Sequence, residues 1–119
     1  MMNNPNMRIC LKYKKIYLNR VAIAMIGNPT HLSLQYDEQD GVLYFSPAAS
    51  DDLDAYEIPK FYWTSNLINC QIARIAFLKA LQFRFGWENG SKHYFKGMII
   101  RPDNIPTLAY ILTDGTRIR

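Results

Sequence analysis

The chain contains little of what secreted, membrane-spanning or metal-binding proteins need. Its 119 residues include two cysteines, Cys10 and Cys70, which is too few for a disulfide framework or a cysteine-based metal cluster. We expect two separate buried thiols. Apolar runs such as Val21–Ile26 fall far short of the ~20 residues that a membrane span requires. The opening "MMNNPN" is polar, unlike a secretory signal. We therefore expect a reduced, cytoplasmic protein without a membrane partner.

Sequence signatures of catalysis are also missing. The chain has no glycine-rich phosphate loop, nucleophile elbow or spaced set of metal ligands. His31 and His93 are isolated, and we interpret both as structural. Asp51, Asp52 and Asp54 lack the glycine-containing loop and distal glutamate of a calcium site, so a solvated linker is the better interpretation. We expect no enzymatic activity, no cofactor, no metal site and no small-molecule substrate.

The charges are unevenly distributed along the chain. The formal net charge is +4, yet residues 8–20 contain five basic residues and no acid, whereas residues 37–57 contain seven acids and no base. Such a separation can steer a polyanion toward one face and repel it from another. The alternative is that both runs are simply solvated loops and sheet edges.

The first half of the chain has the pattern of a small β-α-β-β unit. "RICLKY" and "KIYLN" are typical of short strands. A short helix is expected near Arg20–Ile26, because Gly27 and Pro29 follow it. "THLSLQY" places Leu32, Leu34 and Tyr36 on one face, and the polar turn "DEQDG" joins it to "VLYFSP" as a hairpin.

The second half repeats this order of elements. After "FYWTS", helical spacing predicts a helix over Ile75–Phe85, which Gly86 ends. "SKHYFKGMII" and "TLAYILTD" are predicted strands joined by "RPDNIP". The predicted fold class is mainly β with two short α-helices (α+β). Residues 1–119 form one domain, with a first unit at 8–47, an acidic linker at 48–60 and a second unit at 61–119.

A gapless shift of 59 positions supports an internal duplication. It places "KIYLNRVAIAMIG", residues 15–27, on "RIAFLKALQFRFG", residues 74–86, with six like-for-like positions in thirteen. The shift also suggests that "RIAF" is partly extended. A unit this small cannot bury its hydrophobic face alone. We therefore expect each half to complete the core of the other about an approximate twofold.

The first unit resembles the AbrB/MraZ-like swapped-hairpin module of bacterial transcription factors. The positions that carry the resemblance are Lys15, Ile16, Leu18, Arg20, Ile26, Gly27 and the turn at Asp37–Gly41. The resemblance implies that two units interlock their hairpins into one barrel and that basic strand and loop residues contact DNA. It covers residues 15–47 well and residues 74–113 loosely.

The sequence departs from that pattern in the first helix. Asn19 replaces the proline that usually opens this helix, and Ile23 replaces its usual arginine. Val21 and Ala24 replace its usual acids. The helix has therefore lost its polar face, which suggests that this face packs against another part of the protein.

The basic run and the resemblance together predict a DNA-binding transcriptional regulator. The residues expected to contact DNA are Arg8, Lys12, Lys14, Lys15, Arg20, Arg74 and Lys79. In a strand, Lys12 and Lys14 share one face while Tyr13 and Lys15 share the other. An alternative is that the lysines protect an edge strand from aggregation. Self-association of the chain is left open.

A non-catalytic protein-interaction or assembly module is the second functional hypothesis. Phe61, Tyr62, Trp63 and Trp87 can form core or an aromatic binding patch. DNA binding requires Lys12, Lys14, Lys15 and Arg20 to lie on the same exposed surface as Arg74 or Lys79, with the acidic segment 37–57 elsewhere. Dispersed lysines, or lysines paired with Asp51–Asp54, favour the interaction module.

Overall fold

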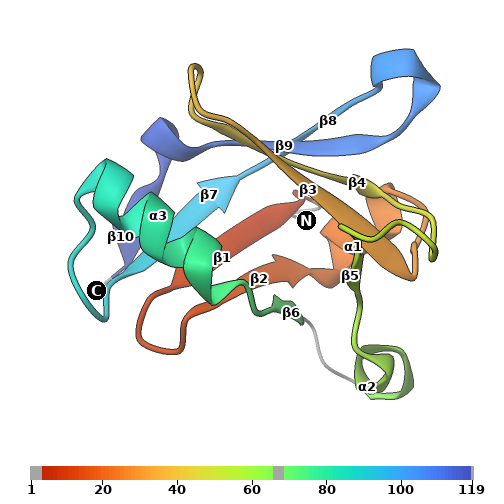
Figure 1. The fold of residues 1–119 in the computed structure, drawn as a ribbon, viewed down its shortest axis with the longest axis horizontal. Coiled ribbons are helices and arrows are strands. Elements are labelled where there is room, and N and C mark those ends of the chain that lie inside the picture. Colours follow the sequence, from red (N-terminus) through yellow and green to blue (C-terminus); the bar gives the residue numbers. More distant parts are fainter. Residues whose placement is uncertain (1–3, 66–68, 119) are drawn as a thin grey trace.

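The computed structural model describes residues 4–65 and 69–118, so the first three residues of the polar opening segment lie outside the described part. The fold consists of two antiparallel five-stranded sheets with short helices at their margins (Figure 1). The predicted class, mainly β with short helices, is confirmed. Sheet A has the strand order β10-β7-β1-β2-β6, and sheet B has the order β5-β3-β4-β9-β8.

The elements have the following bounds. Sheet A contains β1 (Asn6–Cys10), β2 (Lys15–Asn19), β6 (Asn69–Ile72), β7 (Lys92–Lys96) and β10 (Thr116–Ile118). Sheet B contains β3 (His31–Asp37), β4 (Val42–Pro47), β5 (Tyr56–Glu57), β8 (Met98–Ile100) and β9 (Thr107–Ile111). The helices are α1 (Arg20–Met25), α2 (Lys60–Thr64) and α3 (Ile75–Phe85), with 3-10 turns at Pro102–Asn104 and Leu112–Asp114.

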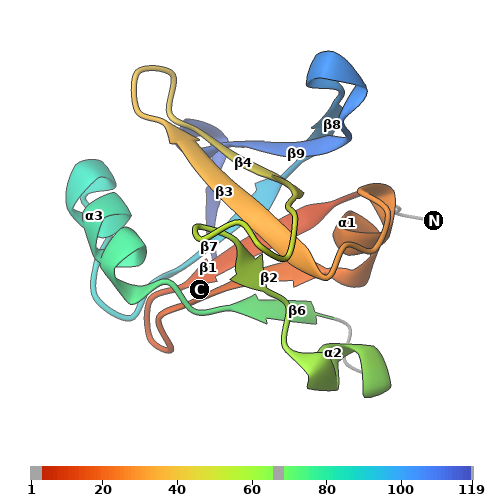
Figure 2. The ribbon, with the colours of Figure 1, turned by 45° about the vertical axis from the view of Figure 1, so that its right-hand side comes forward.

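The two sheets enclose one hydrophobic core. Figure 2 shows β3 and β4 crossing over β1 and β2. Because side chains alternate along a strand, every second residue points between the sheets. Sheet A contributes Met7, Ile9, Ile16, Leu18 and Phe95, and sheet B contributes Leu32, Leu43, Phe45, Leu108 and Tyr110. The prediction that Leu32, Leu34 and Tyr36 share one face of β3 is confirmed, since Leu32 belongs to this core and the other two pack against it.

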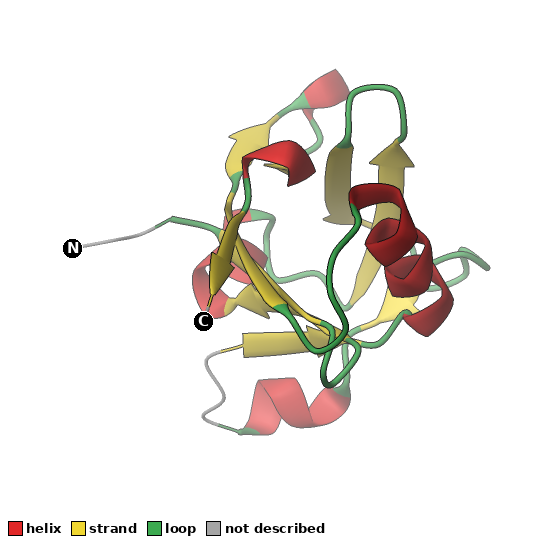
Figure 3. Ribbon diagram, turned by 90° about the vertical axis from the view of Figure 1, so that its left-hand side faces the viewer, coloured by secondary structure: helices red, strands yellow, loops and turns green. Residues whose placement is uncertain are grey.

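The two predicted helices form at the expected places. α3 spans the predicted Ile75–Phe85 and ends at Gly86, which adopts the left-handed conformation with φ 65°. It lies at one side of the sheets (Figure 3) and buries Leu78 and Leu81. α1 begins after Asn19, whose side-chain oxygen accepts a hydrogen bond from the Ala22 amide at 2.9 Å. Asn19 is therefore a helix N-cap, which accounts for its presence at the position where proline was expected.

The chain passes from sheet A to sheet B at Gly97, which separates β7 from β8. A Cβ at this position would lie 2.4 Å from the Tyr110 ring and 2.7 Å from the Pro5 carbonyl oxygen. Only glycine fits so close an approach. The predicted single strand over residues 91–100 is therefore wrong, because this glycine divides it between two sheets.

Several other local predictions are corrected. β1 ends at Cys10, so Leu11–Lys14 form the turn before β2. "KFYWT" forms α2, a helix that was not predicted, and the predicted acidic linker at 48–60 contains the short β5. The final strand β10 was not predicted. The helix α2 and the strands β5 and β10 have five, two and three residues, so each contains less than two full periods of its pattern.

The swapped-hairpin barrel is not confirmed, because the two sheets remain separate and open. The shift of 59 positions places the strand β2 on the first turn of the helix α3. The prediction that "RIAF" is partly extended is therefore wrong, because the helix already begins at Ile75. The strands that follow the two helices are also paired differently. β3 and β4 stay together in sheet B, whereas β7 joins sheet A and β8 joins sheet B. Among residues 4–65 and 69–118, no helix has the length and apolar content needed to cross a membrane.

Candidate nucleic-acid interface

The face of sheet A that points away from the core carries a mixture of basic and aromatic side chains. We call this surface the outer face. Its members come from alternate positions of the three central strands: Asn6, Arg8, Lys15, Tyr17, Lys92, Tyr94 and Lys96. The residues between them are buried, as the alternation of a strand requires.

Strand register places an arginine between two tyrosines. Arg8 in the central strand β1 lies directly opposite Tyr17 of β2 and directly opposite Tyr94 of β7. Directly opposed residues of antiparallel strands project from the same face and approach closely. The guanidinium carbon of Arg8 lies 5.4 Å from the centre of the Tyr17 ring, a cation–π distance.

Lysines border this row on two sides. In the next row toward the β1–β2 turn, Cys10 lies opposite both Lys15 and Lys92. In the row on the other side, Asn6 lies opposite Lys96. The Lys15 ammonium donates a hydrogen bond of 2.8 Å to the Gln71 side-chain oxygen of β6, which fixes this lysine along the sheet.

A hollow of about 210 Å³ lies on the outer face near the β1–β2 turn. It is lined by Arg8, Ile9, Cys10, Tyr13, Tyr17 and Lys92. Tyr13 is 58% exposed, and the Lys12 ammonium lies 5.5 Å from the centre of its ring. Burial raises the pKa of Tyr17, and the adjacent Arg8 opposes this effect only in part. The Tyr17 phenol is therefore neutral and adds no negative charge to the surface.

The β1–β2 turn extends the basic surface beyond the strands. Lys12 and Lys14 lie in this turn and are exposed, so the prediction that they alternate along a strand is wrong. Lys14 has φ 55°, a left-handed conformation that a tight turn requires. The Leu11 amide donates a hydrogen bond to the Ser91 carbonyl oxygen at 2.9 Å, which holds the turn beside β7.

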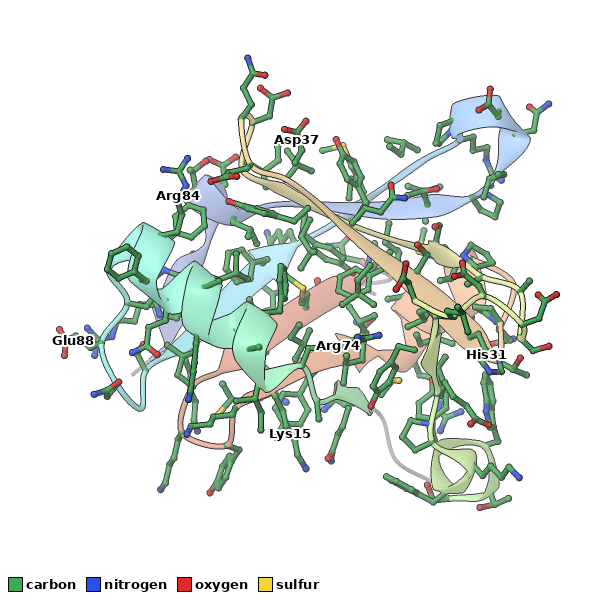
Figure 4. The ribbon with its side chains drawn as sticks, in the orientation of Figure 1. Lys15, His31, Asp37, Arg74, Arg84 and Glu88 are labelled. Carbon is green, nitrogen blue, oxygen red and sulfur yellow. The ribbon has the colours of Figure 1, made fainter. Side chains whose placement is uncertain are left out.

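In the described part of the chain, carboxylates are scarce around the outer face, and the one that borders it is Asp114, which lines a hollow of about 350 Å³ with Tyr94 and Lys96. The outward positions of β1, β2, β6 and β7 contain no aspartate or glutamate. Within the described ranges, Arg8, Lys12, Lys14, Lys92 and Lys96 form no ion pair. Figure 4 shows Lys15 near the lower margin of the molecule and Asp37, in the acidic segment, near the upper margin.

Three of the predicted DNA-contacting residues lie outside this face. Arg20 donates a hydrogen bond of 3.1 Å to the Tyr62 carbonyl oxygen, and its guanidinium carbon lies 4.4 Å from the centre of the Tyr62 ring. Lys79 lies on the exposed side of α3, beside a hollow that Phe83 and Glu88 also line. Arg20 and Lys79 belong to α1 and α3 rather than to sheet A, so the expectation that the lysines of the β1–β2 region share one surface with Arg20 and with Arg74 or Lys79 is wrong.

Arg74 contacts the acidic segment directly. It donates to the Asp54 carbonyl oxygen at 3.4 Å, and its guanidinium carbon lies 5.3 Å from the centre of the Tyr56 ring. Arg84 likewise donates to the Glu38 carbonyl oxygen at 3.3 Å. The expectation that the acidic segment lies away from every predicted basic residue is therefore wrong for Arg74, although it agrees with the position of Lys15.

The isolated histidines and cysteines have structural surroundings. The His93 Nε2 atom lies 2.9 Å from the Ser91 hydroxyl, and the imidazole stacks on the Trp87 ring at 4.5 Å. Cys10 and Cys70 are free and buried, which confirms two separate thiols. Burial raises the pKa of Cys70 to about 12. Within residues 4–65 and 69–118, no group of three or more side chains is arranged to hold a metal ion.

Sequence reasoning missed Lys92, Tyr94 and Lys96. Their alternation in "KHYFK" was the available signal, and it matches the pattern of "KIYLN". Comparisons with protein-family models, curated proteins and solved structures found no match to the chain. The resemblance to the AbrB/MraZ-like module therefore stays a prediction.

Proposed function

We propose that the chain binds nucleic acid through the outer face of sheet A. The observation that carries this proposal is the position of the basic residues on interior strands. β1 is the central strand of sheet A, and β2 and β7 flank it. The true edge strands of the described sheet are β10 and β6.

The location of the basic residues on interior strands argues against the alternative that they protect an edge strand from aggregation. Charged side chains protect a sheet against aggregation when they lie on an edge strand with unpaired backbone groups. Arg8 and Tyr17 belong to strands that are paired on both sides. Edge protection therefore does not explain these residues. Polar side chains are usual on the solvated face of an antiparallel sheet, so the support for a polyanion partner comes from the clustering of several cations and tyrosines on outward positions of β1, β2 and β7 that hold no aspartate or glutamate.

The surface offers the two kinds of contact that nucleic acids use. Phosphates bind basic side chains and backbone donors, which supply most of the affinity and its dependence on salt. Nucleobases present flat faces that stack on aromatic side chains and on guanidinium groups. Of the residues predicted from the sequence, the proposal retains Arg8, Lys12, Lys14 and Lys15, and it adds Lys92 and Lys96.

Fluorescence anisotropy with labelled oligonucleotides tests the proposal. The face variant Arg8→Ala/Lys14→Ala/Lys92→Ala removes three cations from the outer face or its turn. The matched control Lys79→Ala/Arg84→Ala/Arg101→Ala removes the same charge from exposed positions on α3 and after β8. We expect the face variant to flatten the slope of log affinity against log salt by roughly two to three, and the control to leave it nearly unchanged.

Two results would overturn the proposal. The first is no binding of the unmodified protein to DNA or RNA at low salt, where even non-specific association is measurable. The second is an equal loss of affinity in both triple variants, which would mean that net charge rather than the outer face governs binding. Lys79 was predicted from the sequence to contact DNA. A control variant that keeps its affinity would therefore show that the outer face, rather than the full set of predicted residues, binds the nucleic acid.

Aromatic exposure on α2 favours a second candidate, a non-catalytic protein-interaction module. Phe61 is 51% exposed and Trp63 is 37% exposed on this five-residue helix. The contact of Arg74 with Asp54 also agrees with this hypothesis. Pull-down experiments with unmodified protein and with Phe61→Ser/Trp63→Ser test it, and a partner that both proteins retain equally would contradict a role for α2.

A further inference from the structure

The geometry points to single-stranded nucleic acid, rather than a duplex, as the ligand of the outer face, with bases stacked beside Arg8 on Tyr17 and Tyr94. This inference rests on the proposed function and narrows its ligand. Its basis is the row of side chains in which Arg8 lies between Tyr17 and Tyr94.

The spacing of the rings suits separate bases. Neighbouring strands lie about 4.8 Å apart, and β1 lies between β2 and β7, so the backbones of Tyr17 and Tyr94 are roughly 10 Å apart. Two bases can each meet one ring only if they are not stacked directly on one another. Bases in a duplex are already stacked and paired, whereas those of a single strand can be splayed out.

The shape of the outer face also favours single-stranded nucleic acid. Direct reading of a duplex uses an element that enters a groove, such as a helix or a two-stranded ribbon. Here the rings lie in the middle of a sheet, and paired strands flank β1 on both sides. Tyr17 and Tyr94 are half-buried, so they present ring surface at the level of the sheet. A stack of paired bases cannot reach that surface, but an unpaired base can.

The hollow beside the row is small. Its volume of about 210 Å³ lies below the roughly 300–1,000 Å³ of pockets that bury drug-sized ligands. A single base suits a space of this size, with its sugar and phosphate outside. Tyr13 and Tyr17 supply ring surface there, and Arg8 and Lys92 supply positive charge. The exposed Lys12 and Lys14 extend the path along which a backbone can run.

The charges on the outer face also suit a single strand. Binding of single strands without sequence preference combines a basic track for the phosphates with aromatic rings for successive bases. On the outer face, Lys15 and Lys92 border the tyrosine–arginine row on one side and Lys96 borders it on the other. Phosphates on both sides of a stacked base therefore have basic partners, and the side with Lys15 and Lys92 is the more favourable one because Asp114 lies beside Tyr94 and Lys96.

The test uses oligothymidylate and oligouridylate of about twelve nucleotides, a length within the roughly 4–16 nucleotides that one single-strand-binding fold typically covers. Their affinities are compared with that of a DNA duplex of the same length. Anisotropy is measured with the unmodified full chain at one fixed salt concentration. We expect at least one of the single strands to bind several-fold more tightly than the duplex. Duplex affinity equal to or greater than that of both single strands overturns this inference but leaves the proposed function standing. Absence of all binding at low salt overturns both.

Ring variants give an independent result. Tyr17→Ala and Tyr94→Ala each remove a stacking platform and should weaken single-strand binding by about 5- to 150-fold, the range measured for lost base–aromatic stacking. Tyr17→Phe and Tyr94→Phe keep the rings and should retain most of the affinity. Equal losses in the alanine and phenylalanine variants would contradict stacking. Far-ultraviolet circular dichroism establishes that each variant is folded before it is compared.

Discussion

Arg8 and Tyr17 lie directly opposite each other on adjacent strands, and the guanidinium carbon of Arg8 is 5.4 Å from the centre of the Tyr17 ring. A cation–π pair of this kind contributes about 0.5–1 kcal/mol at an exposed site. Both side chains lie on the solvated face of an antiparallel sheet, where polar residues are usual, so this small contribution is not needed to hold them there. Their shared orientation toward solvent makes the pair available to a ligand.

Replacement of Arg8 by lysine separates the charge of this side chain from its shape. Lysine keeps the positive charge but lacks the flat guanidinium that stacks on rings and forms paired hydrogen bonds with phosphate. We expect Arg8→Lys to lower the affinity for a single strand several-fold while leaving the slope of log affinity against log salt unchanged. Arg8→Ala should change both quantities, and identical behaviour of the two variants would contradict a role for the guanidinium plane. Anisotropy titrations at three or more salt concentrations provide both numbers.

Gly97 is expected to tolerate a side chain poorly. The side chain in Gly97→Ala would overlap the Tyr110 ring and the Pro5 carbonyl oxygen, at 2.4 Å and 2.7 Å. Overpacking of this kind costs about 1–3 kcal/mol or more of unfolding free energy. The control is Gly90→Ala, where an added Cβ meets nothing within 4 Å and only the positive φ of 77° is unfavourable. Urea unfolding should give the larger loss for Gly97→Ala; equal losses would contradict the close approach at the crossing between sheets.

The cap of α1 is expected to contribute measurably to stability. Asn19 accepts from the Ala22 amide at 2.9 Å and donates to the Asn4 carbonyl oxygen at 2.9 Å. Loss of an N-cap side chain typically costs about 0.5–2 kcal/mol, so Asn19→Ala should lower the unfolding free energy by about that amount. Asn19→Asp retains the accepting oxygen and should be closer to the unmodified protein. Thermal melts compare the two variants, and an equal loss in both would contradict a capping role.

His93 should make the stability of the protein fall in mildly acidic solution. Burial lowers the pKa of His93, and the nearby Arg117 lowers it further. The unfolded chain, with a histidine pKa near 6.5, therefore takes up its proton at a higher pH than the folded protein does. The stabilising effect of the neutral imidazole is complete above about pH 6.5 and is lost as the pH falls through the lower, folded pKa.

Urea unfolding at pH 7.5 and at pH 5 measures this effect. Because other groups also titrate in this range, the comparison uses His93→Gln, which should have a smaller difference between the two pH values. His31→Gln is the matched control, because it removes the other histidine, whose ring lies 2.9 Å from the Thr30 hydroxyl. A pH dependence that survives in His93→Gln but disappears in His31→Gln would contradict the assignment.

Elements with two full turns or a clear alternation were predictable from sequence. The bounds of α3 could be predicted from the helical spacing of apolar residues from Ile75 onward and from the glycine at position 86. The β3–β4 hairpin could be predicted from the alternation of apolar residues on both sides of a polar turn. Local patterns of this kind lie within about a dozen residues. They do not reveal which strands become neighbours.

The candidate site depends on a pairing that joins distant parts of the chain. β1 pairs with β7, so Arg8 lies beside Tyr94 although they are 86 positions apart in sequence. The basic run at residues 8–20 was visible, but Lys92 and Lys96 could be added only after this pairing was known. The turn at Leu11–Lys14 also changed the geometry, since it removed Lys12 and Lys14 from the strands.

Nuclear magnetic resonance mapping of the backbone amides tests the central claim most directly. In a titration of uniformly nitrogen-15-labelled protein with oligothymidylate at low salt, we expect the largest shift changes in β1, β2, β7 and the β1–β2 turn. Residues of α3 and of the β8–β9 connection should change least. Changes concentrated on α2 or α3, with β1 and β7 unaffected at saturation, would contradict binding by the outer face of sheet A.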